Sequence, residues 1–406
     1  MTAPSHSLGR ALVGSPLKRP LVGCAFLCSM LLLLALAFLG HLTIWIGRPL
    51  QAGILFTATA LLAMTVSTPA LVFLWFLDRR ERESVWLFGG ALVWGMAIST
   101  GVSAVFNALG SGVIALGLEM GAVVDSDSLV ADLLTAALVA PPVEEAAKGL
   151  GILILFWFLR SEFDNLRDGL IYGALVGLGF NIAETALYVM AGFLETGEAP
   201  IAHQFATRFV FLGLNGHFLW TALCGAGLGI ARQTARAWLR FAAPAGGFLL
   251  AVFAHAMNNS VGIFAVALLL VLMGHDPTGL IDVSPPQLWL AASLMNVLVQ
   301  GFPYLVFLAL LVVSARQERA VIRTYLADEV DGRIVLPAEF QSIMERMPLL
   351  GMHRAAFVGG RRTLRIANAQ TELAFRKWHL AREGGDPEAD PLVAAWRADI
   401  LHLRNS

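Results

Sequence analysis

Eight stretches of the chain are long and apolar enough to cross a lipid bilayer, and they constrain its fold more than any other feature. A membrane-spanning helix needs roughly 20 mostly apolar residues. The sequence therefore predicts an all-α fold, a polytopic transmembrane bundle of about eight helices. The predicted spans lie near residues 21–47, 51–77, 85–108, 130–159, 169–194, 206–231, 241–273 and 287–314.

Composition supports this class of protein. Apolar residues make up 57% of the chain and charged residues 14%, whereas a soluble domain has about half and about a quarter. The net charge of −1 gives no positive surface for binding nucleic acid. The apolar composition indicates that the protein is surrounded by membrane lipid. The three cysteines are too few for a disulfide framework or a cysteine-based zinc site.

We expect three regions: a cytoplasmic N-terminal segment (1–20), an eight-helix transmembrane domain (21–314) and a cytoplasmic helical tail (315–406). The tail is predicted to contain an amphipathic helix within 364–381 and a second helix from Pro391 to Leu403. The turn residues 384–387 separate them, so the two helices can pair as a hairpin or dock on the membrane domain.

Lysine and arginine are distributed unevenly over the connections between the spans. They occur near 79–82, 160–167 and 232–240 and in both terminal segments, with Arg48 as the one exception to the alternation. The connections without them are 109–129, 195–205 and 274–286. Because positive residues favour cytoplasmic loops, both termini are predicted to be cytoplasmic.

Four predicted spans carry ionisable or amide side chains deep inside. A charge near the bilayer centre costs at least ~3 kcal/mol, so such residues are candidates for function. Counted from the cytoplasmic ends they lie about 12 to 15 residues deep, roughly 20 Å at the helical rise. Their common depth predicts one shared site, made of Glu144, Glu145 and Lys148 in the fourth span, Glu184 in the fifth, His217 in the sixth, and His255, Asn258 and Asn259 in the seventh.

The neighbouring sequence is consistent with such a site. Pro141 and Pro142 precede the glutamate pair and suit a first helical turn. Lys148 follows the glutamates by four and three residues, so it can neutralise one of them. In the fifth span glycines recur every four residues from 169 to 177, a pattern that lets another helix approach closely.

Together these motifs resemble those of the PrsW family of intramembrane proteases. They are Glu144-Glu145-x-x-Lys148, Phe180-x-x-x-Glu184, His217, and His255-x-x-x-Asn259 on consecutive spans. The related CAAX prenyl endopeptidases typically have EExxxR and FxxxH, so Lys148 and Glu184 favour the PrsW branch. The resemblance covers about residues 130–265.

The resemblance implies an intramembrane endopeptidase that cleaves single-span or otherwise membrane-anchored proteins in a bacterial plasma membrane. An anti-sigma factor is the best-known type of substrate. The catalytic residues it implies are Glu144, Glu145, Lys148, Glu184, His217, His255 and Asn259.

Two mechanisms agree with these residues. Peptide hydrolysis needs a base to activate water and donors for the oxyanion. Either glutamate of the pair can be the base, with the histidines and an asparagine amide as donors. Alternatively, Glu184, His217 and His255 form a two-histidine, one-carboxylate set for a divalent metal such as zinc. The chain has no HExxH motif, so no local signature decides for zinc.

A second class of function uses the same residue types. Intramembrane Glu, Lys and His also mark proton relays, and proline-broken helices mark transport sites. A proton- or ion-coupled transporter is therefore the alternative function. The polar clusters are confined to spans four to seven, and no repeat relates the two halves, which counts against the common repeat-built transporters.

The predicted orientation can be tested by cysteine labelling. In a variant whose three native cysteines are replaced by serine, a single cysteine at position 198 should react with an impermeant thiol reagent on intact cells, because 195–205 is predicted to face outward. A cysteine at position 236 should react only after permeabilisation. The reverse pattern would invert the topology.

Overall fold

The computed structural model describes residues 15–78, 84–120, 129–160, 162–274, 283–344 and 354–405, and every regular element in this part is a helix. The predicted all-α fold is therefore confirmed. The positive residues at 79–82, most of the N-terminal segment and parts of two outer connections (121–128 and 275–282) lie outside the described residues.

The chain forms two compact units, one built from residues 8–76 and 84–307 (the bundle unit) and the other mainly from 308–406 (the tail unit). The helices of the bundle unit before the site are α2 (Pro20–Trp45), α3 (Leu50–Val66), α4 (Thr68–Leu77), α5 (Val85–Val93) and α6 (Thr100–Met120). Those that follow are α7 (Leu129–Leu134), α8 (Ala140–Phe158), α9 (Leu166–Thr196), α10 (Ile201–Arg208), α11 (His217–Gln233), α12 (Leu239–Met257) and α13 (Ile263–Leu272).

The last long helix, α14 (Pro285–Asp331), begins in the bundle unit and ends in the tail unit. It continues without a break past residue 314, where the sequence predicts the end of the membrane domain. The tail unit also contains α15 (Pro337–Met344), α16 (Arg354–Glu383) and α17 (Pro391–Asn405). Of the two arrangements that the sequence leaves open for these helices, the structure contains the hairpin, because α16 packs on α17 and buries Leu373 with Val393 and Ile400 in one apolar cluster.

Among the described residues, five helices are long and apolar enough to cross a membrane, or up to seven if two bent helix pairs each count as one span. The bent pairs are α3 with α4 and α10 with the segment Val210–Gln233. The remaining predicted span, 130–159, is the one that carries Glu144, Glu145 and Lys148. A helical membrane bundle is thus confirmed, and the count of eight stays a prediction.

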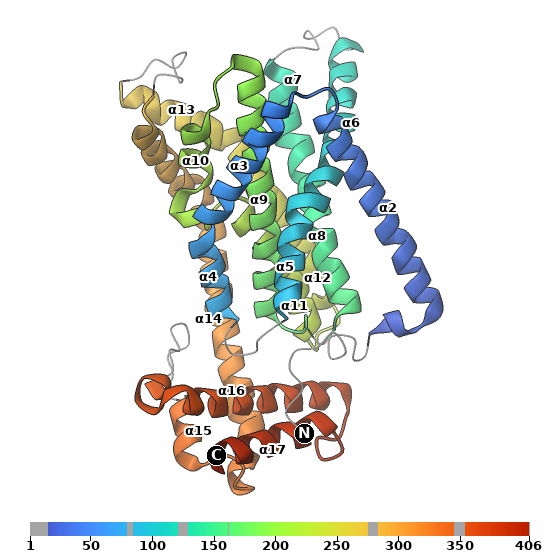
Figure 1. The fold of residues 1–406 in the computed structure, drawn as a ribbon, viewed down its shortest axis with the longest axis vertical. Coiled ribbons are helices and arrows are strands. Elements are labelled where there is room, and N and C mark those ends of the chain that lie inside the picture. The colour runs from blue at the N-terminus through green and yellow to red at the C-terminus, as the bar shows by residue number, and fades with distance from the viewer. Residues whose placement is uncertain are drawn as a thin grey trace. The chain divides into compact units, whose positions relative to one another are not determined.

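Helix α9 occupies the centre of the bundle unit, where it packs against α3, α5, α8 and α11 (Figure 1). Its start is set by a capping box: the Asn165 side chain accepts hydrogen bonds from the backbone N–H groups of Arg167 and Asp168, and the Asp168 carboxylate accepts one from the backbone of Asn165. Its end is set by Gly197, whose φ of 80° favours glycine. Between these caps most of the helix is buried.

The glycine stripe of α9 brings α11 into backbone contact. A Cβ atom added to Gly173 would lie 2.3 Å from the carbonyl oxygen of Thr221, and one added to Gly177 would lie 2.0 Å from that of His217. Both distances are far below van der Waals contact, so only glycine fits. The predicted close approach is confirmed, and it is made to the helix turn that carries His217 and Thr221.

Helix α8 begins where the proline pair predicts. Pro141 and Pro142 occupy its first turn, a position where proline is tolerated. The chain does not stop there, because Val139 keeps a right-handed helical conformation and a π-helical turn, Thr135–Val139, connects α7 to α8. Glu144 and Glu145 follow in the second turn of α8.

Substitution of the stripe should separate α9 from α11. We expect Gly173→Ala to destabilise the protein by about 1–3 kcal/mol, the usual cost of overpacking, and to lower the temperature of thermal unfolding in detergent. Gly246→Ala in α12 is the matched control, because a Cβ there meets nothing within 4 Å. Equal unfolding temperatures for the two variants would contradict the packing argument.

Candidate active site

Six of the seven sequence-predicted site residues meet in the interior of the bundle unit. They come from four helices: Glu144, Glu145 and Lys148 from α8, Glu184 from α9, His217 from α11 and His255 from α12. All are buried except Glu184, whose side chain keeps 14% of its surface exposed. The common depth of these residues therefore corresponds to one cluster.

Lys148 lies at the centre of this cluster and is completely buried. Its Nζ atom donates to Glu145 Oε1 at 2.6 Å and lies 3.8 Å from Glu144 Oε2. It also lies 4.2 Å from the centre of the Phe180 ring, whose face attracts a cation. A buried ammonium needs such compensation, because an unpaired charge in an apolar interior costs several kcal/mol.

Glu145 is fully occupied by hydrogen bonds. Besides Lys148, its Oε1 atom faces His255 Nδ1 at 3.1 Å, and its Oε2 atom accepts the hydroxyl hydrogen of Thr221 at 3.0 Å. The residue itself has no exposed surface. Glu145 therefore connects α8, α11 and α12, and each of its two oxygens has a hydrogen-bond partner.

His217 is held at both ring nitrogens. Nδ1 lies 2.8 Å from Lys148 Nζ and Nε2 lies 2.6 Å from Glu184 Oε2. Because an ammonium only donates, Nδ1 accepts from Lys148, and Nε2 then carries the hydrogen that is donated to Glu184. Gly216, with a φ of 60°, precedes this histidine and allows the sharp entry into α11.

Glu184 has a second partner that sequence reasoning missed. Arg208, the last residue of α10, donates from Nη1 to the same Oε2 atom at 2.7 Å, and its guanidinium stacks on Tyr188 at 4.3 Å. The signal was present in the sequence, since Arg208 is an arginine inside a predicted span and needs an acidic partner there. Arg208 compensates the charge of Glu184.

Glu144 is the carboxylate with an open oxygen. Its Oε1 atom accepts from Asn107 Nδ2 of α6 at 3.1 Å, whereas Oε2 is buried without a hydrogen-bond partner. That oxygen lies 3.8 Å from His255 Nε2. Because His255 Nδ1 donates to Glu145, Nε2 presents a lone pair, so two electron-pair donors face each other across this gap.

The three residues Glu144, His217 and His255 form a group that could hold a metal ion, since one ligand atom from each lies within 4.8 Å of the others. Two histidines and a glutamate are a ligand set that zinc proteases use. The open oxygen of Glu144 fits this reading, because this buried oxygen accepts no hydrogen bond and the Lys148 ammonium lies 3.8 Å away from it. This group contains Glu144 in the place where the sequence predicts Glu184, whose carboxylate accepts from His217 and Arg208. Which carboxylate is a metal ligand stays a prediction.

Asn259, the seventh predicted site residue, is directed elsewhere. Its Nδ2 atom donates to the backbone carbonyl of Ala136 at 3.0 Å, and Asn258 Nδ2 donates to Asn259 Oδ1 at 3.2 Å. Both partners belong to π-helical turns, Thr135–Val139 and Asn258–Gly262, and such turns leave backbone groups available for extra bonds. Asn259 therefore joins the segment before α8 to the segment after α12.

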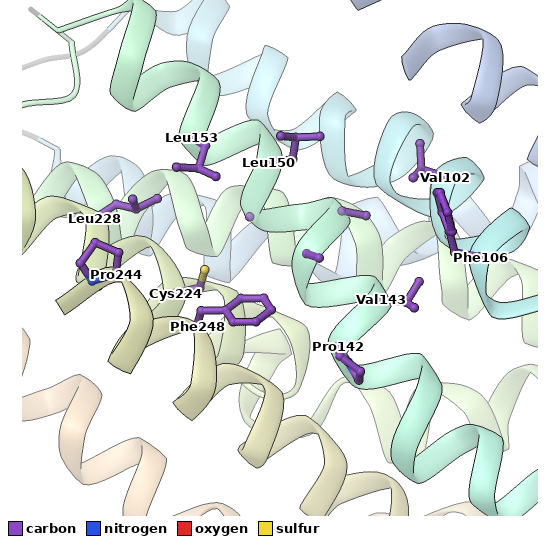
Figure 2. Close-up of a pocket in the computed structure, with 13 residues that line it drawn as sticks. Val102, Phe106, Pro142, Val143, Leu150, Leu153, Cys224, Leu228, Pro244 and Phe248 are labelled. Atoms are coloured by element: carbon purple, nitrogen blue, oxygen red, sulfur yellow. The ribbon is translucent and has the colours of Figure 1, made fainter. Parts of the chain in front are cut away.

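An apolar cavity of about 690 Å³ lies beside α8, between α6, α11 and α12 (Figure 2). Ala146, Leu150 and Leu153 line it from α8 and share one helical face. At about 100° per residue, that face is opposite to the one that presents Glu144, Glu145 and Lys148. The cavity offers no polar side chain for chemistry apart from the Cys224 thiol and is separate from the ionisable cluster.

Part of the sequence is similar to known proteins. Residues 83–279 match the family described as PrsW family intramembrane metalloprotease, a range that contains every ionisable side chain of the cluster. Protease PrsW of Geobacillus kaustophilus is 32% identical over 94 residues, which is 21% of this chain and 42% of the relative. The match thus spans less than half of that relative, and no solved structure matches.

The motifs that the sequence presents in order lie within the matched range, and the structure brings their side chains into one buried cluster. Over this range, slightly less than half of the chain, the sequence is therefore similar to the PrsW family.

Proposed function

We propose that this protein is an intramembrane endopeptidase that hydrolyses peptide bonds of membrane-anchored proteins. The observation that carries the proposal is the open oxygen of Glu144, buried within a bundle of apolar helices and facing two histidines. The family description and the name of the relative support the same reaction. A single-span protein is the proposed substrate class, and an anti-sigma factor in a bacterial plasma membrane is the substrate type to test first.

Glu144 is the proposed centre of the chemistry. Its Oε2 atom is the position where a water proton can be accepted, and Asn107 on the other oxygen holds the carboxylate in place. Glu145 cannot fill this role without breaking bonds to Lys148, Thr221 or His255. We therefore assign water activation to Glu144 and the organisation of the neighbouring helices to Glu145.

Lys148 supplies the fixed positive charge. Its ammonium, held by Glu145 and by His217 Nδ1, lies where negative charge develops next to Glu144 during attack on a carbonyl. Preorganised charge of this kind stabilises a transition state because it needs no rearrangement during the reaction. His217 is in turn oriented by Glu184, whose charge Arg208 compensates.

We further propose that Glu144, His217 and His255 hold one divalent metal ion, zinc being the first choice for these ligands. When bound, such an ion polarises a carbonyl and acidifies water. Its binding at His217 competes with the contact between His217 Nδ1 and Lys148. Without an ion, Glu144 acts as the general base directly.

The first test compares the two adjacent glutamates. Glu144→Gln should lower cleavage of a single-span substrate by about 10²–10⁴-fold, because it removes a base or a ligand. It should leave the unfolding temperature nearly unchanged. Glu145→Gln should also destabilise the protein by about 3–5 kcal/mol, because Lys148 loses the partner of a buried ion pair. Fragments are measured by mass spectrometry and stability by thermal unfolding.

Glu198→Gln is the control, since this exposed acid lies outside the cluster. Full activity in Glu144→Gln would contradict the assignment. Ion flux in proteoliposomes without cleavage of any substrate would instead support the transporter, whose proton path would follow the hydrogen bonds from Glu184 through His217 and Lys148 to Glu145.

The second test concerns the metal ligands. Purified protein should contain about one zinc or other divalent ion per chain by elemental analysis, and His217→Ala or His255→Ala should release it. Glu144→Gln should lose the ion, whereas Glu184→Gln should retain it with weaker affinity. If Glu184→Gln loses the metal ion and Glu144→Gln keeps it, the ligands are Glu184, His217 and His255, as the sequence predicts. If the purified protein is active without a metal ion, Glu144 acts as the general base by itself.

A further inference from the structure

Helix α14 reaches the histidines through one buried amide, although it lies beyond residue 279, where the family match ends. Gln300 has no exposed surface. Its Oε1 atom accepts from Trp220 Nε1 at 3.1 Å, and its Nε2 atom donates to the carbonyl of Ala254 at 2.8 Å. One side chain thus connects α11, α12 and α14 by hydrogen bonds.

Both partners of Gln300 adjoin the histidines. Trp220 stacks on His255 with ring centres 4.2 Å apart and planes 16° apart, and it meets His217 edge to face at 4.8 Å. Ala254 directly precedes His255 in α12. The indole therefore fills the corner between two imidazoles whose own ring centres lie 4.8 Å apart.

The second bond is made where α12 changes its helical form. The Ala254 carbonyl also accepts from the backbone N–H of Asn258, the residue at which the π-helical turn Asn258–Gly262 begins. A carbonyl at such a transition has bonding capacity to spare, and the amide of Gln300 uses it. Gln300 thereby holds the backbone of α12 at the turn that carries His255.

We propose that Gln300 is a positioning residue for the two histidines: by holding Trp220 and the Ala254 carbonyl, it fixes the distance and angle between His217 and His255. A polar amide in the middle of an apolar span is costly unless it is satisfied, and here both ends of the amide are bonded. The expected effect on catalysis rests on the proposed peptidase function. The contact of Gln300 with Trp220 and Ala254 is independent of it. Helix α14 is then part of the site although it contributes no catalytic residue.

The experiment compares the wild-type full chain with three single variants and one double variant. Gln300→Met removes both hydrogen bonds at similar side-chain length, and Trp220→Phe removes the indole N–H while keeping a ring. Asn296→Leu is the control: it is equally buried, lies one turn earlier in α14, and its amide donates to the Ala292 carbonyl of the same helix.

For a single-span substrate, Gln300→Met should lower kcat by roughly 10- to 100-fold, the range seen when residues that support a site are removed. KM should change little, because no substrate contact is lost. Asn296→Leu should keep the wild-type kcat. The double variant Trp220→Phe, Gln300→Met should lose less than the two single losses combined, since both single variants break the same Trp220–Gln300 hydrogen bond.

Unchanged kcat in Gln300→Met, an equal loss in Asn296→Leu, or additive losses in the double variant would each overturn the proposal. If Gln300→Met does not fold, the kcat of Trp220→Phe decides in its place. If the wild-type protein cleaves nothing, the peptidase function fails. The contact between Trp220 and Gln300 is then tested by the unfolding temperatures of the wild type, the two single variants and the double variant. The decreases caused by the two single substitutions should not add up in the double variant.

Discussion

The ion pair between Lys148 and Glu145 is the interaction on which the arrangement of the site depends. A charge inside an apolar bundle is retained only if its neighbours compensate it, and here the compensation extends to three further helices. Glu145 engages Thr221 and His255, while Lys148 engages His217, which in turn engages Glu184. Each charge thus holds the next side chain in one orientation, and the buried polar groups organise the helices as well as the chemistry.

Close helix packing is what makes this network possible. The glycines of α9 let the backbone of α11 approach until no Cβ atom fits between the two helices, so Glu184 and His217 reach hydrogen-bonding distance. On the opposite side Gln300 of α14 holds Trp220 against both histidines. Between these two constraints, the open oxygen of Glu144 is the place where the network remains incomplete and where chemistry can occur.

Much of this was predictable from the residues alone. The membrane class, the proline-initiated start of α8, the close approach at the glycine stripe and the tail hairpin follow from local sequence and are confirmed. Two features of the structure were not among the predictions. The group of possible ligands that the structure brings together contains Glu144 in the place of Glu184, and Arg208 was missed although an arginine in a span needs an acidic partner.

The sequence by itself determined which residues share a depth in the membrane, because the rise of a helix is constant and depth follows from counting along the chain. Only the tertiary structure decided which side chains face one another, because that depends on how each helix is rotated and how closely it packs. The rotation of its helix directs Asn259 toward the Ala136 carbonyl. The packing of the helices places Glu184 within hydrogen-bonding distance of Arg208 and His217. The same holds for Gln300. Its position in the chain gives its depth, but only helix packing places its side chain against Trp220.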